Sequence, residues 1–260
     1  MLIEPSPTPY DLQFRLFGVP VRVHPFFWVT AVILGSRGFS GEVQPMAQLL
    51  MWVAVVFVSI LVHEMGHALA IRFYGWRPWI TLYAFGGLAS YEPGYSGYAK
   101  SYSRRGNATT GQIIISLAGP IAGFLLAALV AAGLFAVGRM SGFYLFGRPI
   151  ILGRGGPIEN PYLAILTFQL LAVNIYWGLL NLLPVYPLDG GKVSRELFTA
   201  FSRRDGYQNS LILSIAVAVV IAGYAFLNRD IWLCILFGIL AYQSYQLLQH
   251  HRGGWRGNSW

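Results

Sequence analysis

Two histidines and a glutamate stand in the sequence HEMGH, residues 63–67, within the apolar run VAVVFVSILVHEMGHALAIRF. In a helix, positions i and i+4 project from one face, so His63 and His67 present their imidazole nitrogens together. This spacing is typical of a seat for zinc. Glu64 is their neighbour on the helical wheel, where a carboxylate can act as a general base toward water without binding the metal.

The alternative interpretation is a chance match to this pattern, with buried histidines that form only hydrogen bonds. The apolar surroundings argue against it, because an unpartnered carboxylate within a membrane span costs several kcal/mol. The pattern therefore favours metal-assisted hydrolysis.

A hydrolytic zinc site takes three protein ligands and keeps a fourth position open for water. Asp189, in the segment NLLPVYPLDGG, is the candidate for the third ligand. In the predicted topology, the helix with HEMGH and the helix before Asp189 both run toward the same leaflet. Two prolines interrupt that second helix, and irregular backbone at membrane depth usually lines an enclosed cavity. Asp189 could equally cap the helix that begins at GGKVSREL, and both interpretations stay open at this point.

The composition indicates a membrane protein that crosses the bilayer several times. Of the 260 residues, 55% are hydrophobic and 11% are charged, far below the roughly 25% charged residues of soluble domains. The basic residues cluster at the ends of apolar runs, which indicates membrane orientation rather than nucleic-acid binding despite a net charge of +8. The single cysteine, Cys234, excludes an internal disulfide and is expected to serve packing.

We predict an all-α polytopic fold with about six transmembrane helices and a short membrane-associated strand or hairpin after the HEMGH helix. The first of the six apolar runs is marginal as a span, because it has only ten residues. The runs are 25–34, 46–74, 112–137, 162–183, 210–227 and 231–248. The alternating FRLFGVPVRVH predicts a strand with a turn at Gly18-Val19-Pro20, and WITLYAFGGLASY predicts a strand or hairpin at 79–91. Residues 138–161 are expected to form a loop.

With six spans, thirteen of the 18 Lys and Arg residues fall on the side of the N-terminus. This excess predicts that both termini face the cytoplasm. If the first run does not cross, the count becomes eleven against seven and the orientation stays the same. No cleavable signal peptide is expected, since the first residues are polar and contain proline.

HExxH in one apolar helix and N-x-x-P-x-x-P-x-D-G in a later one resemble the site-2 protease family of intramembrane zinc metalloproteases. GVPVRVHPFF, the Gly-Gly strand and SLAGP extend the likeness from about residue 14 to 250. The resemblance implies one Zn²⁺ per chain, with His63, His67 and Asp189 as its ligands. It implies that Glu64 is the catalytic base and that Asn181 holds the substrate or polarises its carbonyl. A helix-to-helix hydrogen bond is the other possibility for Asn181.

By the same resemblance, the expected domains are a cytoplasmic segment at 1–24, a transmembrane metalloprotease domain at 25–249 and a short polar tail at 250–260. No PDZ-like or CBS-like module is expected. The expected partners are a transmembrane protein substrate and the lipid bilayer of the inner or plasma membrane, without nucleic acid. The sequence does not indicate the oligomeric state.

Some assignments stay open. The segment 79–91 offers either a free strand edge for an unwound substrate or a hairpin that plugs the helical bundle. His24 is either a fourth metal contact or, as we favour, an interfacial histidine. Gly123 stands where many relatives have asparagine, so we expect no polar role there. His250 and His251 lie too near the end to form a site alone. The competing functions are a metal or proton transporter and a catalytically silent scaffold.

Overall fold

The computed structural model describes residues 5–36, 43–84, 86–92, 108–145, 148–202 and 205–256, the last five of these by their backbone alone. The described residues form two compact units. The first unit lies within residues 5–92 and 118–178, and the second lies within residues 108–117 and 179–256.

Seven helices and seven strands lie in the described residues. The strands are β1 (Leu12–Leu16), β2 (Val19–Val23), β3 (Arg77–Tyr83), β4 (Gly86–Glu92), β5 (Arg139–Leu145), β6 (Arg148–Gly153) and β7 (Gly156–Pro157). The helices are α1 (Pro25–Gly35), α2 (Pro45–Phe73), α4 (Thr109–Ala136), α5 (Pro161–Asn181), α6 (Asp189–Phe201), α7 (Gly206–Leu227) and α8 (Ile231–Arg256).

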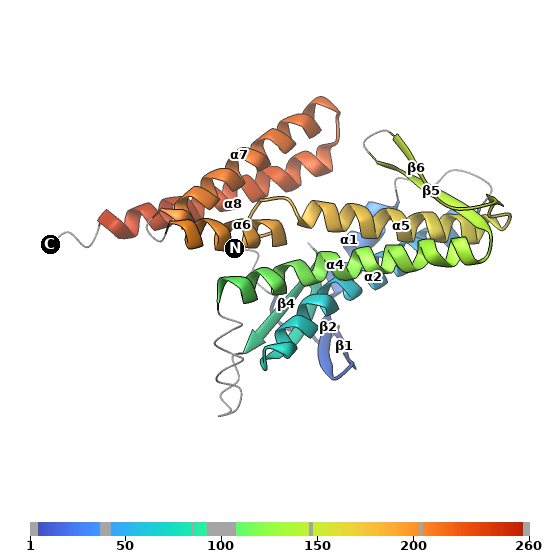
Figure 1. The fold of residues 1–260 in the computed structure, drawn as a ribbon, viewed down its shortest axis with the longest axis horizontal. Helices are drawn as coiled ribbons and strands as arrows, with labels where there is room; N and C mark the ends of the chain where they lie inside the picture. The colour runs from blue at the N-terminus through green and yellow to red at the C-terminus, as the bar shows by residue number, and fades with distance from the viewer. Residues whose placement is uncertain are drawn as a thin grey trace. The chain divides into compact units, whose positions relative to one another are not determined.

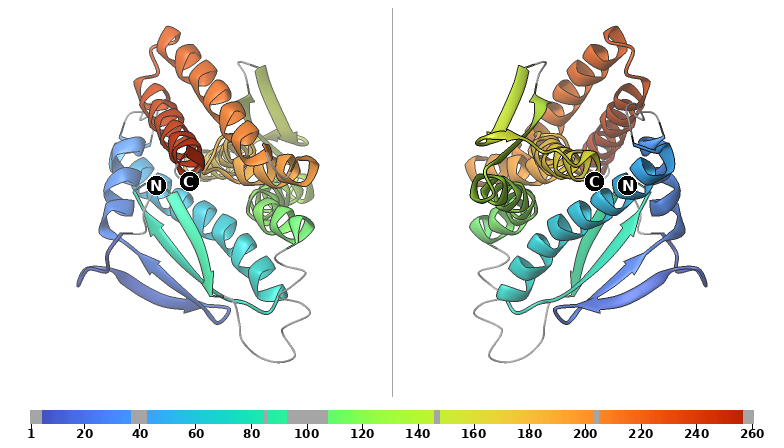
Figure 2. Two further views of the ribbon diagram at one scale, coloured as in Figure 1. Left: turned by 90° about the vertical axis from the view of Figure 1, so that its left-hand side faces the viewer. Right: turned by 90° about the vertical axis from the view of Figure 1, so that its right-hand side faces the viewer.

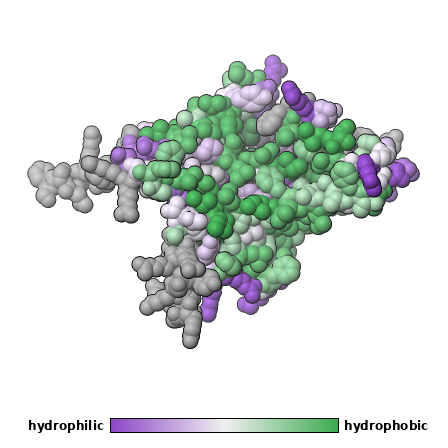
Figure 3. All heavy atoms as spheres, in the orientation of Figure 1, coloured by the Kyte–Doolittle hydropathy of each residue, from purple (hydrophilic) through white to green (hydrophobic). Residues whose placement is uncertain are grey.

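Five of the described helices, namely α2, α4, α5, α7 and α8, are long and apolar enough to cross a membrane. The expected first span, α1, has 11 residues, fewer than the roughly 20 that a bilayer requires. Large hydrophobic side chains such as Leu129 and Val220 are each 70% exposed, and Figure 3 shows hydrophobic residues over most of the visible face. Lipid must cover such a surface. The chain is an integral membrane protein, and the predicted helical polytopic fold is confirmed.

The first sheet has four strands in the order β1-β2-β3-β4. β1 and β2 form a hairpin whose two turn residues, Phe17 and Gly18, have φ angles of 50° and 79°. Positive φ at both turn positions matches the twist of the flanking strands. The predicted turn at Gly18-Val19-Pro20 is therefore wrong by one residue, since Val19 already belongs to β2 and its side chain is buried.

The segment after α2 is a hairpin, which is one of the two forms, strand or hairpin, that the sequence predicts for residues 79–91. β3 and β4 pair antiparallel, with Tyr83 opposite Gly86 at the turn. β2 pairs in parallel with β3, with Val21 opposite Ile80. The N-terminal strands and the hairpin therefore form one sheet.

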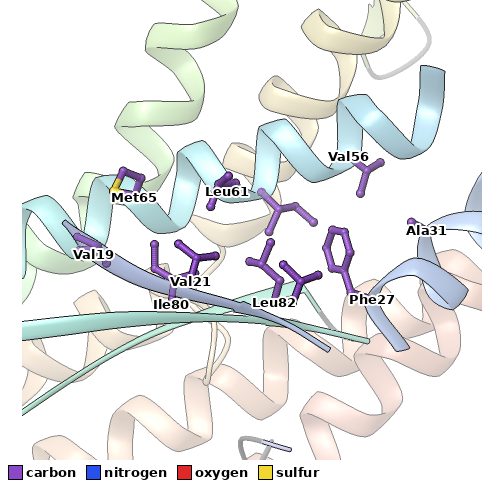
Figure 4. Packing of buried hydrophobic residues seen from close by; sticks show 12 residues of the cluster. Val19, Val21, Phe27, Ala31, Val56, Leu61, Met65, Ile80 and Leu82 are labelled. Atoms are coloured by element: carbon purple, nitrogen blue, oxygen red, sulfur yellow. The ribbon is translucent and has the colours of Figure 1, made fainter. Parts of the chain in front are cut away.

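One face of this sheet packs against the half of α2 that carries HEMGH (Figure 2). Figure 4 shows Val21, Ile80 and Leu82 of the sheet directed toward Leu61 and Met65 of α2. All five side chains are at most 8% exposed, so hydrophobic burial holds the helix on the sheet.

The short helix α1 is joined to α2 by a tryptophan. Trp52 Nε1 donates a hydrogen bond to the carbonyl oxygen of Ala31 at 3.0 Å. A Cβ at Gly35 would lie 2.3 Å from the Trp52 ring, so the glycine lets the two helices approach this closely.

A second sheet replaces the loop expected at 138–161, and that expectation is wrong. Its strands have the order β6-β5-β7, and β5 and β6 form the hairpin labelled in Figure 1. Phe143 of β5 is 4% exposed and packs with Ala127 of α4 and Leu171 of α5. The stretch contains several glycines and no sustained alternation, and its strands are stabilised by this contact with the flanking helices α4 and α5.

In the second unit, α7 and α8 form the helical hairpin that the sequence predicts (Figure 1). The connection is Asn228 to Asp230, as expected. The hydrophobic core of this unit contains Val185, from the segment before α6. Val185 is buried there and packs with Ala218, Phe237 and Leu240.

The N-terminal segment is tied to the first sheet through Asp11. Its carboxylate accepts hydrogen bonds from the Thr8 backbone N–H at 3.1 Å and hydroxyl at 2.6 Å, and from Arg22 Nη1 at 3.0 Å. Burial raises the pKa of Asp11, but these hydrogen bonds and the Arg22 charge outweigh it and leave the pKa below its ordinary value.

We predict that protonation of Asp11 releases this segment. Because the pKa is lowered in the folded state, the stabilisation is present above pH about 4 and is lost as the pH falls through the folded-state pKa. The protection of β1 and β2 amides against hydrogen exchange, relative to the intrinsic rate at each pH, should fall in that acid range. Asp11→Asn should show this lower protection at neutral pH already, whereas Asp205→Asn, at an exposed helix end without a side-chain cap, should match the parent chain. Equal protection in Asp11→Asn and the parent chain would contradict this.

Candidate metal centre

The HEMGH residues lie in the buried part of α2. His63, Glu64 and His67 are 2%, 5% and 6% exposed. His63 Nε2 and His67 Nε2 are 3.2 Å apart, and their rings are nearly perpendicular at 79°. Two ligands of a tetrahedral zinc ion, each bonded at about 2.05 Å, lie about 3.3 Å apart. The imidazole pair therefore fits zinc, although the same distance also suits a hydrogen bond between the two rings.

Glycines of neighbouring elements leave room for these side chains. A Cβ at Gly119 of α4 would lie 2.1 Å from His67 Nε2, and a Cβ at Gly87 of β4 would lie 2.3 Å from Glu64 Cγ. Any larger residue at either position would occupy the place of the functional group. The Gly-Gly strand and the SLAGP helix are thus in direct contact with the HEMGH side chains.

The backbones of α2 and α4 also touch. A Cβ at Gly66, the glycine of HEMGH itself, would lie 2.3 Å from the carbonyl oxygen of Ala118. This is the close helix approach that small residues permit in lipid. It explains why a glycine stands between the two histidines, on the face toward α4.

Asn174 of α5 is a polar residue of this region that the sequence analysis did not assign. Its Nδ2 donates to Ser59 Oγ at 2.9 Å and to the Leu170 carbonyl oxygen at 2.8 Å. Ser59 lies one helical turn before His63, so this hydrogen bond joins α5 to α2 beside the histidines. An asparagine in the middle of an apolar span was the signal that could have identified it.

His24 has a structural role. Its Nδ1 accepts a hydrogen bond from Phe26 N at 3.2 Å and so caps α1. Its backbone N–H donates to the Leu82 carbonyl oxygen at 2.8 Å. These hydrogen bonds give His24 a helix-capping role, and its position at the membrane interface stays a prediction.

The remaining predicted site residues belong to the second unit. Asp189 is the first residue of α6 and is 3% exposed, and its Oδ1 forms an ion pair with Lys192 Nζ at 3.1 Å. The N-cap of α6 is Leu188, and no side chain caps this end, so the interpretation of Asp189 as an N-cap is wrong. Asn181 is the last residue of α5 and is 8% exposed.

Comparison with known proteins identifies the family. The model of peptidase family M50 matches residues 51–224. The zinc metalloprotease MJ0392 of Methanocaldococcus jannaschii is 24% identical over 235 residues, covering 86% of this chain and 57% of that protein. Stage IV sporulation protein FB of Bacillus subtilis is 27% identical over 200 residues, covering 76% of this chain and 54% of that protein. The chain thus spans about half the length of these curated relatives.

The fold has a counterpart among solved structures. The site-2 protease from Methanocaldococcus jannaschii matches with a TM-score of 0.53 and 21% identity, over 92% of this chain and 95% of that one. At this identity the likeness concerns the fold. The residues matched by the family model include HEMGH, SLAGP and the LDGG segment, and on that match the chain belongs to peptidase family M50.

Proposed function

We propose that this chain is an intramembrane zinc metalloprotease that hydrolyses peptide bonds within transmembrane segments of other proteins. The observation that carries the proposal is the pair of imidazoles, 3.2 Å apart and buried beside Glu64 on a helix of membrane-spanning length. Membership of a peptidase family and zinc metalloproteases among the relatives support it.

We propose His63, His67 and Asp189 as the ligands of one Zn²⁺. Two imidazoles and one carboxylate are a common ligand set for catalytic zinc. With neutral imidazoles, the ion and these ligands sum to a charge of +1, far less costly in a low-dielectric surrounding than the bare ion. When bound, zinc supplies a Lewis acid that polarises a carbonyl and makes a water molecule more acidic.

The other roles belong to protein side chains. The Glu64 carboxylate would accept a proton from the attacking water and pass it to the nitrogen of the leaving amine. The Asn181 side-chain amide would donate a hydrogen bond to the oxygen of the scissile carbonyl, where negative charge develops. In other hydrolases a donor of this kind contributes about 3 kcal/mol.

A substrate helix must unwind before attack, because its carbonyl groups are engaged in helical hydrogen bonds. We propose that β4 receives the unwound segment as an added strand. β4 is an end strand of the described sheet, and its Gly87 contacts Glu64. Strand addition here would bring an extended backbone beside the general base.

The active site and both termini are proposed to face the cytoplasm. Because β2 pairs with β3, we propose that the segments before α1 and after α2 lie on the same side of the membrane. If α1 is counted as a crossing despite its 11 residues, that side holds thirteen of the 18 Lys and Arg residues.

Replacement of the base tests the reaction. Glu64→Gln keeps the shape of the side chain but cannot accept the proton, so cleavage of a labelled membrane-spanning peptide should fall by about 10²–10⁴ while zinc content stays unchanged. Glu159→Gln, at a side chain 82% exposed, should retain full activity. Cleavage in the parent chain should also stop when a chelator removes zinc.

Three outcomes would contradict the proposal. Ion flux through sealed vesicles that depends on Glu64, without peptide cleavage, would identify a transporter. Cleavage that persists in a chelator would identify a hydrolysis that does not depend on zinc. No cleavage across a diverse panel of membrane peptides would indicate a catalytically silent scaffold.

A pair of glycine variants on α4 tests the proposed zinc site. Gly119→Ala places a methyl group against His67 and should weaken zinc binding at least tenfold, as changes to the surroundings of a ligand commonly do. Gly133→Ala is the matched control, because a Cβ there meets no atom within 4 Å. Equal zinc affinity in both variants would contradict the assignment of His67 as a ligand.

Cysteine labelling tests the orientation. In a Cys234→Ala background, Asn228→Cys in the α7–α8 turn should react with a membrane-impermeant maleimide added to whole cells. Asp205→Cys, before α7, should react only after the cells are opened. Both native side chains are exposed, and the reverse pattern would place the active site on the outer side.

A further inference from the structure

The segment between α5 and α6 has an unusual backbone. It contains Pro184 and Pro187, neither of which has an N–H group, so regular helical hydrogen bonding is interrupted. Val185 within it is fully buried, and Asp189 at its end is 3% exposed. Buried peptide groups in such a segment need hydrogen-bond partners from elsewhere in the protein.

Serines of the next two helices supply those partners at Tyr186. The Tyr186 N–H donates to Ser214 Oγ of α7 at 3.1 Å. Ser244 Oγ of α8 donates to the Tyr186 carbonyl oxygen at 3.3 Å. The Tyr186 backbone is therefore held at both of its polar groups, one from each helix of the α7–α8 hairpin.

Ser214 has a second link to the same segment. Its Oγ lies 3.2 Å from the carbonyl oxygen of Pro184 and 2.9 Å from that of Ser210, two acceptors for its single proton. Ser214 and Ser244 are 1% and 0% exposed. Water does not compete for these hydrogen bonds, so their loss would leave Tyr186 unsatisfied.

Two glycines transmit the position of this segment to Asp189. A Cβ at Gly190 would lie 2.1 Å from the Leu182 carbonyl oxygen, and a Cβ at Gly191 would lie 2.4 Å from Tyr186 N. The first turn of α6 is thus in backbone contact with the segment that the serines hold. A displacement of Tyr186 would move that turn and the carboxylate of Asp189 with it.

We propose that Ser214 and Ser244 are positioning residues that set the carboxylate of Asp189 for zinc. The proposal rests on the assignment of Asp189 as a ligand. The helices α7 and α8 carry none of the proposed ligands, but by this proposal they contribute to the affinity for zinc. Residues that orient a ligand without touching the metal commonly contribute ten- to a hundredfold to affinity.

The test is the dissociation constant for zinc, measured on the purified full chain in lipid nanodiscs by competition with a chelator. Ser214→Ala and Ser244→Ala should each weaken zinc binding about 10- to 100-fold. Ser210→Ala is the matched control. Ser210 is also on α7 and is 2% exposed, but its hydroxyl donates within its own helix, to the Tyr207 carbonyl oxygen at 2.8 Å. This control should bind zinc within about twofold of the parent chain.

A cobalt spectrum gives a readout that does not depend on activity. Co²⁺ in place of zinc reports the geometry of its ligands through visible absorption. We expect the band to shift in Ser214→Ala and Ser244→Ala and to stay unchanged in Ser210→Ala. A role of the serines in helix packing alone would lower thermal stability without moving this band.

The outcomes separate this proposal from the one on which it rests. If Asp189→Asn binds zinc as the parent chain does, the ligand assignment is wrong and the positioning role falls with it. If Asp189→Asn loses zinc while Ser214→Ala and Ser244→Ala retain it, only the positioning role is overturned. Equal weakening in Ser210→Ala would also overturn it. Should Ser214→Ala fail to fold, Ser244→Ala, which removes a single hydrogen bond to the segment, decides the question.

Discussion

Polar groups at the depth of a bilayer lose their water and must find other partners, and this requirement shapes both units of the chain. In the first unit it falls on His63, Glu64 and His67, which hydrocarbon side chains and a packed sheet surround. In the second unit the requirement applies to the backbone N–H and carbonyl group of Tyr186, which form hydrogen bonds with serine hydroxyls. A divalent cation would offset the cost of burying His63, Glu64 and His67, as the serine hydroxyls offset the cost of burying the Tyr186 backbone.

The space around the functional groups is made by missing side chains as much as by those present. Gly87 and Gly119 come from a strand and a helix on different parts of the chain, yet both lie within contact distance of HEMGH. Beside Asp189, Gly190 and Gly191 let the first turn of α6 approach the backbone of Leu182 and Tyr186. The motifs HEMGH, SLAGP and LDGG thus share a physical basis, because in each the glycine lets one backbone approach a functional segment closely.

Much of this arrangement can be read from local sequence. The i, i+4 spacing of the histidines, the long apolar helices and the α7–α8 hairpin depend on neighbours within a few turns, so pattern and spacing predict them. The second sheet could not be predicted, because the burial of Phe143 depends on Ala127 of α4 and Leu171 of α5 as well as on its strand neighbours, and the local pattern does not reveal that helices pack there. The hydrogen bonds between Tyr186 and Ser214 and Ser244 span 28 and 58 residues, and a serine in an apolar helix does not by itself indicate its partner. Asn174 was detectable as a polar residue in a span, but its link to Ser59 across 115 residues was not.

The parallel pairing of β2 with β3 has a consequence for biogenesis. The chain between these two strands consists of α1, α2 and their connection, so the ribosome must complete the histidine-bearing helix before β3 exists. Until then, the β1–β2 hairpin has an unpaired edge. The four-stranded sheet can therefore form only after α2 has been synthesised, so its assembly must follow the synthesis of the helix that carries HEMGH.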